Sequence, residues 1–143
     1  MDLTVRDAQA VDAGAVAGLL TQLGYPVDAP MVEARLQRLA VVGDRVVVAE
    51  LEGRVVGLGH LQVAPAIEYD RPAARIGALV VDERHRGRGV GRALVKALED
   101  EARLRGCEVL SLTTSEHRDN AHMFYERVGL QHTGRRYGRT LSE

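Results

Sequence analysis

The stretch VVDERHRGRGVGRAL, from Val80 to Leu94, is the part of the sequence on which the interpretation of the whole chain depends. An apolar run typical of a strand ends at Asp82, and a helical pattern begins near Val90. Arginines and alternating glycines stand between the two: Arg84, Arg86, Gly87, Arg88, Gly89, Gly91 and Arg92. The sequence therefore predicts a strand, a glycine-rich loop and a helix in direct succession.

A loop of this composition at the start of a helix is suited to an anion. The first turn of a helix leaves backbone N–H groups without intrahelical partners and carries the positive end of the helix dipole. Glycine removes the Cβ atoms that would keep a phosphate away from those N–H groups, and arginine adds forked, permanently charged donors. We therefore expect the loop to bind a pyrophosphate or a nucleotide-bearing cofactor.

The spacing of the glycines excludes two common nucleotide motifs. The G-x-G-x-x-G pattern fails in both registers, because Arg92 stands at the last position from one start and Leu94 from the other. The P-loop pattern fails because Gly-Lys-Ser/Thr does not occur in the sequence. The pattern that does fit is R-x-x-G-x-G, with Arg86, Gly89 and Gly91 at its fixed positions.

Composition narrows the kind of protein further. The 143 residues are 45% hydrophobic and 27% charged, which fits a single domain over residues 1–143. No apolar run approaches the roughly 18 residues of a membrane span, and the first residues do not resemble a signal peptide. With the single Cys107, this predicts a cytoplasmic protein. A net charge of -1 and 3% aromatic residues argue against nucleic acid as a partner, and no histidine spacing is typical of a metal site.

Strand and helix patterns alternate along the rest of the chain. Strands are expected over Leu3–Arg6, Arg45–Glu50, Arg54–Val63, Ala74–Val81, Glu108–Thr113 and Leu130–Leu141. Helices are expected from about Val11 to Leu23, from Asp28 to just before Gly43, from Val90 to Gly106, and from Asp119 or Asn120 to Arg127. The order β-α-α-β-β-β-α-β-α-β predicts an α/β (α+β) fold, with a mixed central sheet of about six strands and flanking helices.

A second motif, DNAHMFYERVGL from Asp119 to Leu130, follows the first. With both motifs in this order, the chain resembles the Gcn5-related N-acetyltransferase (GNAT) family. The acetyl-coenzyme A motif of that family is Arg or Gln, two residues, Gly, one residue, then Gly or Ala. Its second signature is Asn or Ala before a helix that reads roughly F-Y-E-x-x-G-F, and here Leu130 stands where Phe is usual. The resemblance covers the order of elements along essentially the whole chain and implies a GNAT-like fold.

The resemblance also implies which residues bind acetyl-coenzyme A. The backbone of the fourth strand would bond the pantetheine arm where strands four and five diverge, and the loop would hold the pyrophosphate. The implied donor-binding residues are Leu79, Val80, Val81, Arg86, Gly87, Arg88, Gly89, Val90, Gly91, Arg92 and Asn120. Tyr125 would donate a proton to the departing thiolate.

The general base is where the chain departs from the family pattern. Many members carry a glutamate on the fourth strand, but Ala74–Val81 contains no carboxylate, and Arg75 stands about where the glutamate would be. The candidates are Glu68, the pair Glu116 and His117, or a water chain to bulk solvent. His60 lies in an expected strand and is interpreted as a packed or surface histidine.

Two classes of function follow from the resemblance. The first is an enzyme in which a primary amine of a small molecule or a protein attacks the thioester of acetyl-coenzyme A directly. The alternative is a non-catalytic module that binds or senses acyl-coenzyme A. Tyr125 favours the enzyme, and the missing glutamate leaves room for the module. The expected final strand, Leu130–Leu141, is a candidate edge for a homodimer, and neither a membrane nor a metal is expected as a partner.

Overall fold

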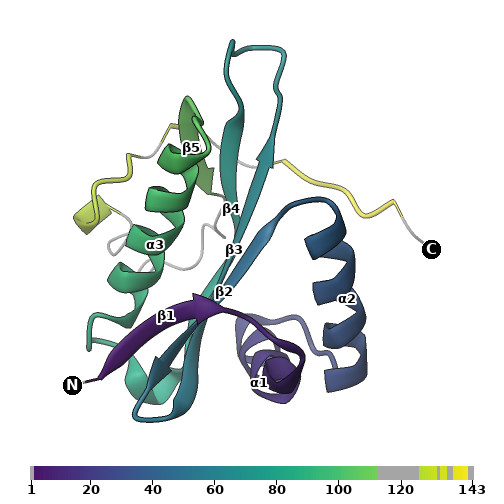
Figure 1. Cartoon of the computed structure of the whole chain (residues 1–143), viewed down its shortest axis with the longest axis vertical. Helices are drawn as coiled ribbons and strands as arrows, with labels where there is room; N and C mark the ends of the chain where they lie inside the picture. The colour runs from purple at the N-terminus through teal and green to yellow at the C-terminus, as the bar shows by residue number, and fades with distance from the viewer. Residues whose placement is uncertain (1, 113–125, 132, 135–136, 142–143) are drawn as a thin grey trace. The chain divides into compact units, whose positions relative to one another are not determined.

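A five-stranded sheet with helices on both faces forms most of the described chain (Figure 1). The structure is a computed structural model that describes residues 2–112, 126–131, 133–134 and 137–141. The chain divides into two compact units, Met1–Ser111 and Leu112–Glu143. The single domain expected over residues 1–143 stays a prediction.

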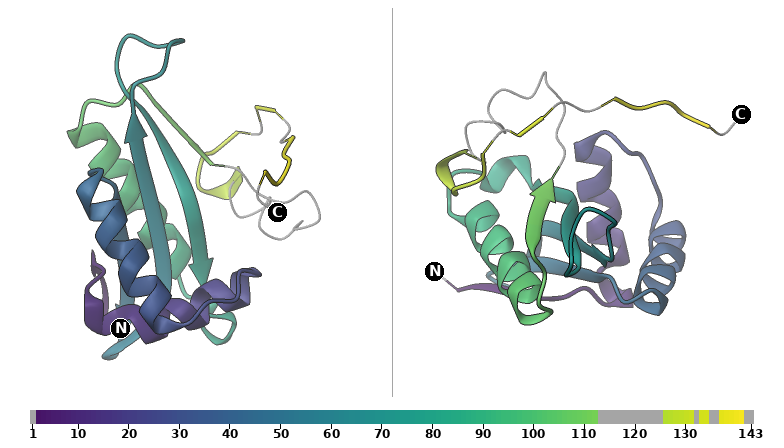
Figure 2. Two further views of the ribbon diagram at one scale, coloured as in Figure 1. Left: turned by 90° about the vertical axis from the view of Figure 1, so that its right-hand side faces the viewer. Right: turned by 90° about the horizontal axis from the view of Figure 1, so that it is seen from above.

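The strands follow one another across the sheet in the order β1-β2-β3-β4-β5. Their bounds are β1 Leu3–Asp7, β2 Arg45–Leu51, β3 Arg54–Ala64, β4 Ala73–Val81 and β5 Val109–Leu112. The pairings from β1 to β4 are all antiparallel, with Val48 opposite Leu58 and Leu58 opposite Val80. The arrows of β4 and β5 run the same way in Figure 2, as a helical crossover between them requires. The sheet is therefore mixed, as expected.

The helices begin and end where local signals predict. Their bounds are α1 Ala13–Leu23, α2 Ala29–Val41 and α3 Val90–Leu104, with short 3-10 turns at Ala10–Asp12 and Glu83–His85. The carboxylate of Asp28 caps α2 by accepting the N–H of Met31 at 3.0 Å. Gly24 ends α1 with a left-handed φ of 110°. Helices α1 and α2 cover one face of the sheet and α3 the other (Figure 2).

Each face of the sheet has its own apolar core. Toward α1 and α2 the buried residues are Ala13, Val16, Ala17, Leu19, Val32, Val48, Leu58 and Val80. On the other face α3 lies very close to β3. A Cβ at Gly57 would stand 2.9 Å from Leu94 Cδ1, and one at Gly59 would stand 2.9 Å from Leu98 Cδ1. The two glycines in β3 therefore allow α3 to approach the sheet.

A β-bulge interrupts the pairing of β3 with β4. His60 pairs with Ala78, but the next residue of β3, Leu61, pairs with Ile76. Gly77 is the extra residue on β4. A bulge bends its strand and increases the local twist, so β4 changes direction at Gly77.

The first helix begins later than expected. The sequence predicts its start near Val11, but α1 begins at Ala13, and Val11 lies in the preceding turn with 86% of its surface exposed. Asp12 makes no side-chain cap on α1, because its carboxylate accepts bonds from Arg6 and from the N–H of Gln9 instead.

The C-terminal unit differs from expectation in its strands. The described residues among 130–141 contain no strand, so the described sheet has five strands rather than about six. The expected start of the short helix lies outside the described residues. Glu126 and Arg127 are helical, and Gly129 follows with a φ of 94° and donates its N–H to the Glu126 carbonyl at 3.1 Å. The helix therefore ends at Arg127, as expected from the sequence.

Candidate functional site

The loop between β4 and α3 is anchored by Asp82. The N–H of Asp82 donates to the Val56 carbonyl at 2.8 Å, which continues the pairing with β3 for one residue beyond β4. The Asp82 carboxylate accepts the N–H of Arg84 at 3.0 Å, and its carbonyl accepts the N–H of His85 at 2.8 Å. The loop therefore leaves the sheet as a fixed turn.

Two of the three glycines are required by the path of the backbone. Gly87 has a φ of 78° and Gly89 a φ of 83°, in the left-handed region that favours glycine. A Cβ at either position would have no described atom within 4 Å. Gly91 lies in the first turn of α3 and is not among the glycines with positive φ. The space beside Gly87 and Gly89 is therefore open on the side where a ligand would approach.

The first turn of α3 follows this open backbone directly. The N–H of Ala93 donates to the Gly89 carbonyl at 3.1 Å. The N–H groups of Val90, Gly91 and Arg92 precede that bond, so they have no carbonyl four residues earlier within the helix. Because α3 is 15 residues long, it presents a full set of aligned peptide dipoles to this end. The geometry suits an anion such as phosphate.

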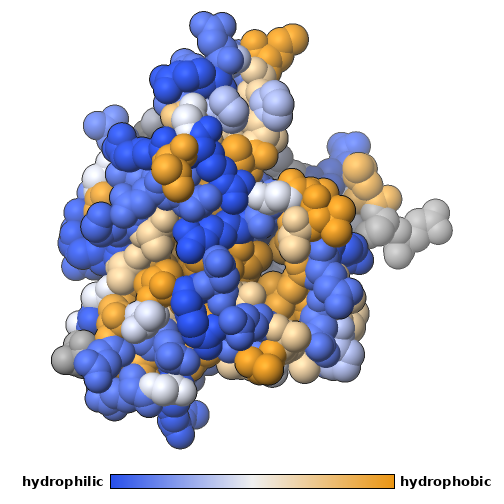
Figure 3. Space-filling view, viewed as in Figure 1, coloured by the Kyte–Doolittle hydropathy of each residue, from blue (hydrophilic) through white to orange (hydrophobic). Residues whose placement is uncertain are grey.

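The loop also carries exposed positive charge. Four of its arginines are exposed, namely Arg84, Arg86, Arg88 and Arg92, and within the described ranges none forms an ion pair. Arg86 Nε donates to the Val81 carbonyl at 3.3 Å, which ties its side chain to the end of β4. Hydrophilic side chains cover much of the surface in Figure 3, with a hydrophobic patch at the tip of the β3–β4 hairpin. The arginines of the loop are therefore available to an anionic ligand.

The remaining predicted residues are distributed more widely. Val80 is buried in the core beneath α1 and α2, whereas Leu79 and Val81 are half-buried. Glu68 is exposed in the connection between β3 and β4. Asn120, Tyr125, Glu116 and His117 lie outside the described residues. The structure thus brings together the strand-four and loop residues and does not describe those of the second motif.

His60, interpreted from the sequence as a packed or surface histidine, has a carboxylate partner. His60 Nε2 lies 2.9 Å from Asp44 Oδ2, and only 15% and 10% of the two side chains are exposed. Asp44 stands directly before β2, and β2 pairs with β3 so that Val46 is opposite His60. The register of the β2–β3 hairpin could have indicated that Asp44 and His60 are close. It places Val46 opposite His60, and Asp44 precedes Val46 by two residues.

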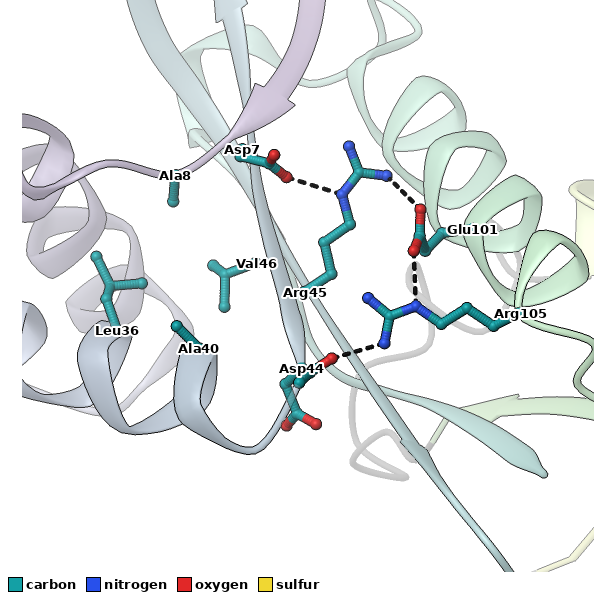
Figure 4. A pocket seen from close by; sticks show the side chains of 10 residues that line it. Asp7, Ala8, Leu36, Ala40, Asp44, Arg45, Val46, Glu101 and Arg105 are labelled. Carbon is teal, nitrogen blue, oxygen red and sulfur yellow. Dashed lines mark hydrogen bonds and ion pairs between the residues drawn. The ribbon is translucent and has the colours of Figure 1, made fainter.

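A pocket of about 550 Å³ lies at the other end of α3 from the loop (Figure 4). Arg45 in this pocket donates to Asp7 at 2.8 Å and to Glu101 at 3.1 Å, and Arg105 donates to Glu101 at 2.6 Å. The hydrogen bond that Arg45 donates to Asp7, together with the charges of the Asp7 and Glu101 carboxylates, raises the pKa of Arg45 above its usual value. These arginines are paired within the protein, so the pocket presents no free cation to a ligand.

The described residues contain neither a candidate metal site nor a candidate membrane-spanning helix. No cluster of three or more histidine, cysteine or acidic side chains there could hold a metal ion. In the same part of the chain, no helix is long and apolar enough to cross a membrane.

The fold and the loop together define a class: a mixed α/β domain whose fourth strand leads through an open, arginine-rich glycine loop into a long helix. The chain belongs to the Acetyltransferase (GNAT) family, whose model matches residues 17–130. The recognition made from the two motifs is thereby confirmed, and so is the fold class.

Individual relatives agree with this assignment. The chain is 28% identical to a glucosamine 6-phosphate N-acetyltransferase of Trypanosoma brucei brucei over 91% of its own length and 92% of the relative's. It is 34% identical to an aminoalkylphosphonate N-acetyltransferase of Salmonella typhimurium over 62% of its own length and 58% of the relative's. A crystal structure of an acetyltransferase from Trypanosoma brucei superposes with a TM-score of 0.84 at 28% identity, covering 98% of this chain and all of that one.

Proposed function

We propose that the protein transfers the acetyl group of acetyl-coenzyme A to a primary amine. The observation that carries this proposal is the open backbone at Gly87 and Gly89, which leads into the N-terminus of α3 in a chain of the GNAT family. A phosphate group can approach this backbone without meeting a side chain.

Acetyl-coenzyme A fits the residues present at this junction. The loop from Arg86 to Arg92 would bind the pyrophosphate through backbone N–H groups and guanidinium donors. The backbone from Leu79 to Val81 would bond the pantetheine arm along β4, on the side that faces β5. Asn120 would add a contact from the second motif. A solved aminoglycoside N-acetyltransferase in complex with CoA has the same fold, with a TM-score of 0.83 at 19% identity over 99% of this chain and 96% of that one.

The acceptor amine would be a small molecule rather than a protein. The relatives above are named for acetylating glucosamine 6-phosphate and aminoalkylphosphonate, and a third, from Bacillus subtilis, is named a spermine/spermidine N(1)-acetyltransferase. All three names describe small amines. Tyr125 would protonate the departing thiolate, and Glu68 is one of the candidate proton acceptors in the sequence, beside the pair Glu116 and His117 and a water chain to solvent.

A thiol-release assay tests the function. Acetyl-coenzyme A is incubated with the protein and one of five amines: glucosamine 6-phosphate, 2-aminoethylphosphonate, spermidine, an aminoglycoside or a peptide with a free N-terminus. We expect thiol release that depends on one of the small amines. Tight binding of acetyl-coenzyme A without release in any mixture would instead support the non-catalytic acyl-coenzyme A module.

Location and assembly are separate proposals. A cytoplasmic location stays a prediction, which fractionation of the source cells tests.

A homodimer is expected from a long final strand, and the described part of residues 130–141 has no strand to support it. Sedimentation at several protein concentrations tests it, because a dimer would show the mass of two chains.

A further inference from the structure

The bulge in β4 leaves an open position next to an imidazole ring. Gly77 is exposed, and a Cβ built on it would lie 3.0 Å from His60 Nδ1 and 3.6 Å from Arg75 Nη1. The ring of His60 therefore reaches from β3 to the backbone of β4 at a position where Gly77 has no side chain. Arg75 Nη1 donates to Gln62 Oε1 at 2.5 Å, which holds the guanidinium on the same face.

Asp44 determines which nitrogen of His60 can accept a proton. An ionised carboxylate is only an acceptor, so the 2.9 Å contact requires a proton on His60 Nε2. In the neutral ring, Nδ1 then carries the lone pair. Asp44 is the hydrogen-bond partner of this side chain among the described residues, and the Arg75 guanidinium lies near the same Gly77 position. The free lone pair thus points toward Gly77.

This position lies close to where the acetyl group is expected. If the proposed function holds, the pantetheine arm lies along Leu79 to Val81, and the family resemblance implies that the thioester lies near a backbone amide of β4. Gly77 precedes Leu79 by two residues, or about 7 Å of extended strand. We propose that His60 Nδ1 accepts the proton of the attacking amine, with Asp44 as the positioning residue that holds the ring. His60 supplies the proton acceptor that β4 itself lacks.

A primary alkylammonium gives one proton to Nδ1, and the freed lone pair of its nitrogen forms a C–N bond to the thioester carbon while the π electrons of the carbonyl move to its oxygen. The oxyanion of the tetrahedral intermediate then re-forms the C=O bond and the C–S bond breaks, and the nitrogen loses a second proton as the amide forms. One proton ends on the coenzyme A sulfur, and the proton on His60 passes to solvent.

The tautomer of His60 tests the proposal without any acceptor. Long-range ¹H–¹⁵N NMR of the whole protein distinguishes Nε2–H from Nδ1–H rings, and His60→Gln identifies the signal. We expect the Nε2–H form in the neutral ring of the wild type, and a mixture of the two tautomers in Asp44→Asn, because an amide can either accept or donate a hydrogen bond. An Nδ1–H ring would overturn the proposal, because that nitrogen could not accept a proton.

Kinetics test the role in the reaction. His60→Gln keeps a donor within reach of Asp44 but removes the second ring nitrogen, so kcat/KM should fall by about 10² to 10⁴ at neutral pH. The deficit should shrink above the pKa of the amine, where the acceptor is already neutral. A deficit of the same size at every pH would overturn the proposal in favour of a structural role. Asp44→Asn should show a smaller loss with the same pH trend.

Controls separate this inference from the proposed function. Asp100→Asn makes the same chemical change as Asp44→Asn on an exposed face of α3, and it should leave kcat/KM unchanged. The affinity of His60→Gln for acetyl-coenzyme A should equal that of the wild type in calorimetric titration. If none of the five amines reacts with the wild type, the proposed function fails, whereas the NMR result still decides the state of His60. A loss in Glu68→Gln with none in His60→Gln would transfer the role to Glu68.

Discussion

The carboxylate of Asp12 accepts a hydrogen bond from each terminal nitrogen of Arg6, with N···O distances of 2.8 and 3.0 Å. Only 5% of the Asp12 side chain is exposed. The pair joins the end of β1 to the turn before α1. Arg6 reaches Glu50 on β2 as well, at 3.2 Å. The hydrogen bonds from Arg6 lower the pKa of Asp12 against the opposing effect of its burial, and the same bonds raise the pKa of Arg6.

This pair predicts how stability depends on pH. Because the pKa of Asp12 is lower in the folded state, the stabilisation is present above the ordinary carboxylate pKa of about 3.9 and is lost as the pH falls through the folded value. Asp12→Asn should reduce the free energy of unfolding by about 1.5 to 3 kcal/mol at pH 7. In urea titrations the difference from the wild type should narrow below about pH 4. A constant difference down to pH 2 would contradict the assignment.

Alanine should have opposite effects on stability at two glycines, one in the contact of α3 with β3 and one on the surface of α1. At Gly57 an added Cβ would stand 2.9 Å from Leu94 Cδ1 and 3.2 Å from Ala49 Cβ, so Gly57→Ala should destabilise by about 1 to 3 kcal/mol. Gly18 lies on the exposed side of α1 with nothing within 4 Å. Gly18→Ala should therefore stabilise by about 0.5 to 1 kcal/mol. Thermal unfolding measures both, and a neutral Gly57→Ala would show that α3 can move away from the sheet at little cost.

A pair of glycine variants should show that the loop between β4 and α3 affects acetyl-coenzyme A binding apart from its effect on stability. Gly89 and Gly106 both have left-handed backbone, with φ of 83° and 74°, and open space around the missing Cβ. Alanine at either should cost about 1 to 2 kcal/mol of stability. Only Gly89 lies in the loop, so Gly89→Ala should weaken acetyl-coenzyme A binding at least about tenfold, which corresponds to about 1.4 kcal/mol. Gly106→Ala, at the far end of α3, should leave the affinity unchanged in calorimetric titration.

Gly91 completes this comparison. The family pattern accepts Ala at this position, and Gly91 lies within α3 rather than in left-handed backbone. Gly91→Ala should therefore bind acetyl-coenzyme A about as well as the wild type. A loss as large as that of Gly89→Ala would show that phosphate approaches the first helical turn more closely than the family pattern implies.

Local signals explain which features could be predicted from the sequence. The loop between β4 and α3, the cap at Asp28 and the stop at Gly24 depend on neighbouring residues, and all are found where expected. The close approach of α3 at Gly57 and the contact of Asp44 with His60 depend on how elements pack or pair, so a single strand or helix pattern did not reveal them. The sequence showed that β4 lacks a carboxylate, but the imidazole beside the bulge became visible only with the register of β3 against β4.

The last prediction concerns Tyr125, which the family resemblance makes the proton donor to the leaving thiolate. Tyr125→Phe keeps the ring but removes the proton, so kcat should fall by about 10² to 10⁴ while acetyl-coenzyme A affinity changes little. Because this proton goes to sulfur, the deficit should not depend on whether the amine is protonated, whereas the deficit of His60→Gln should. Rates measured across the pH range for both variants with one acceptor distinguish the two roles. If Tyr125→Phe turned over at the wild-type rate, the phenol would serve only in packing, and solvent would supply the proton.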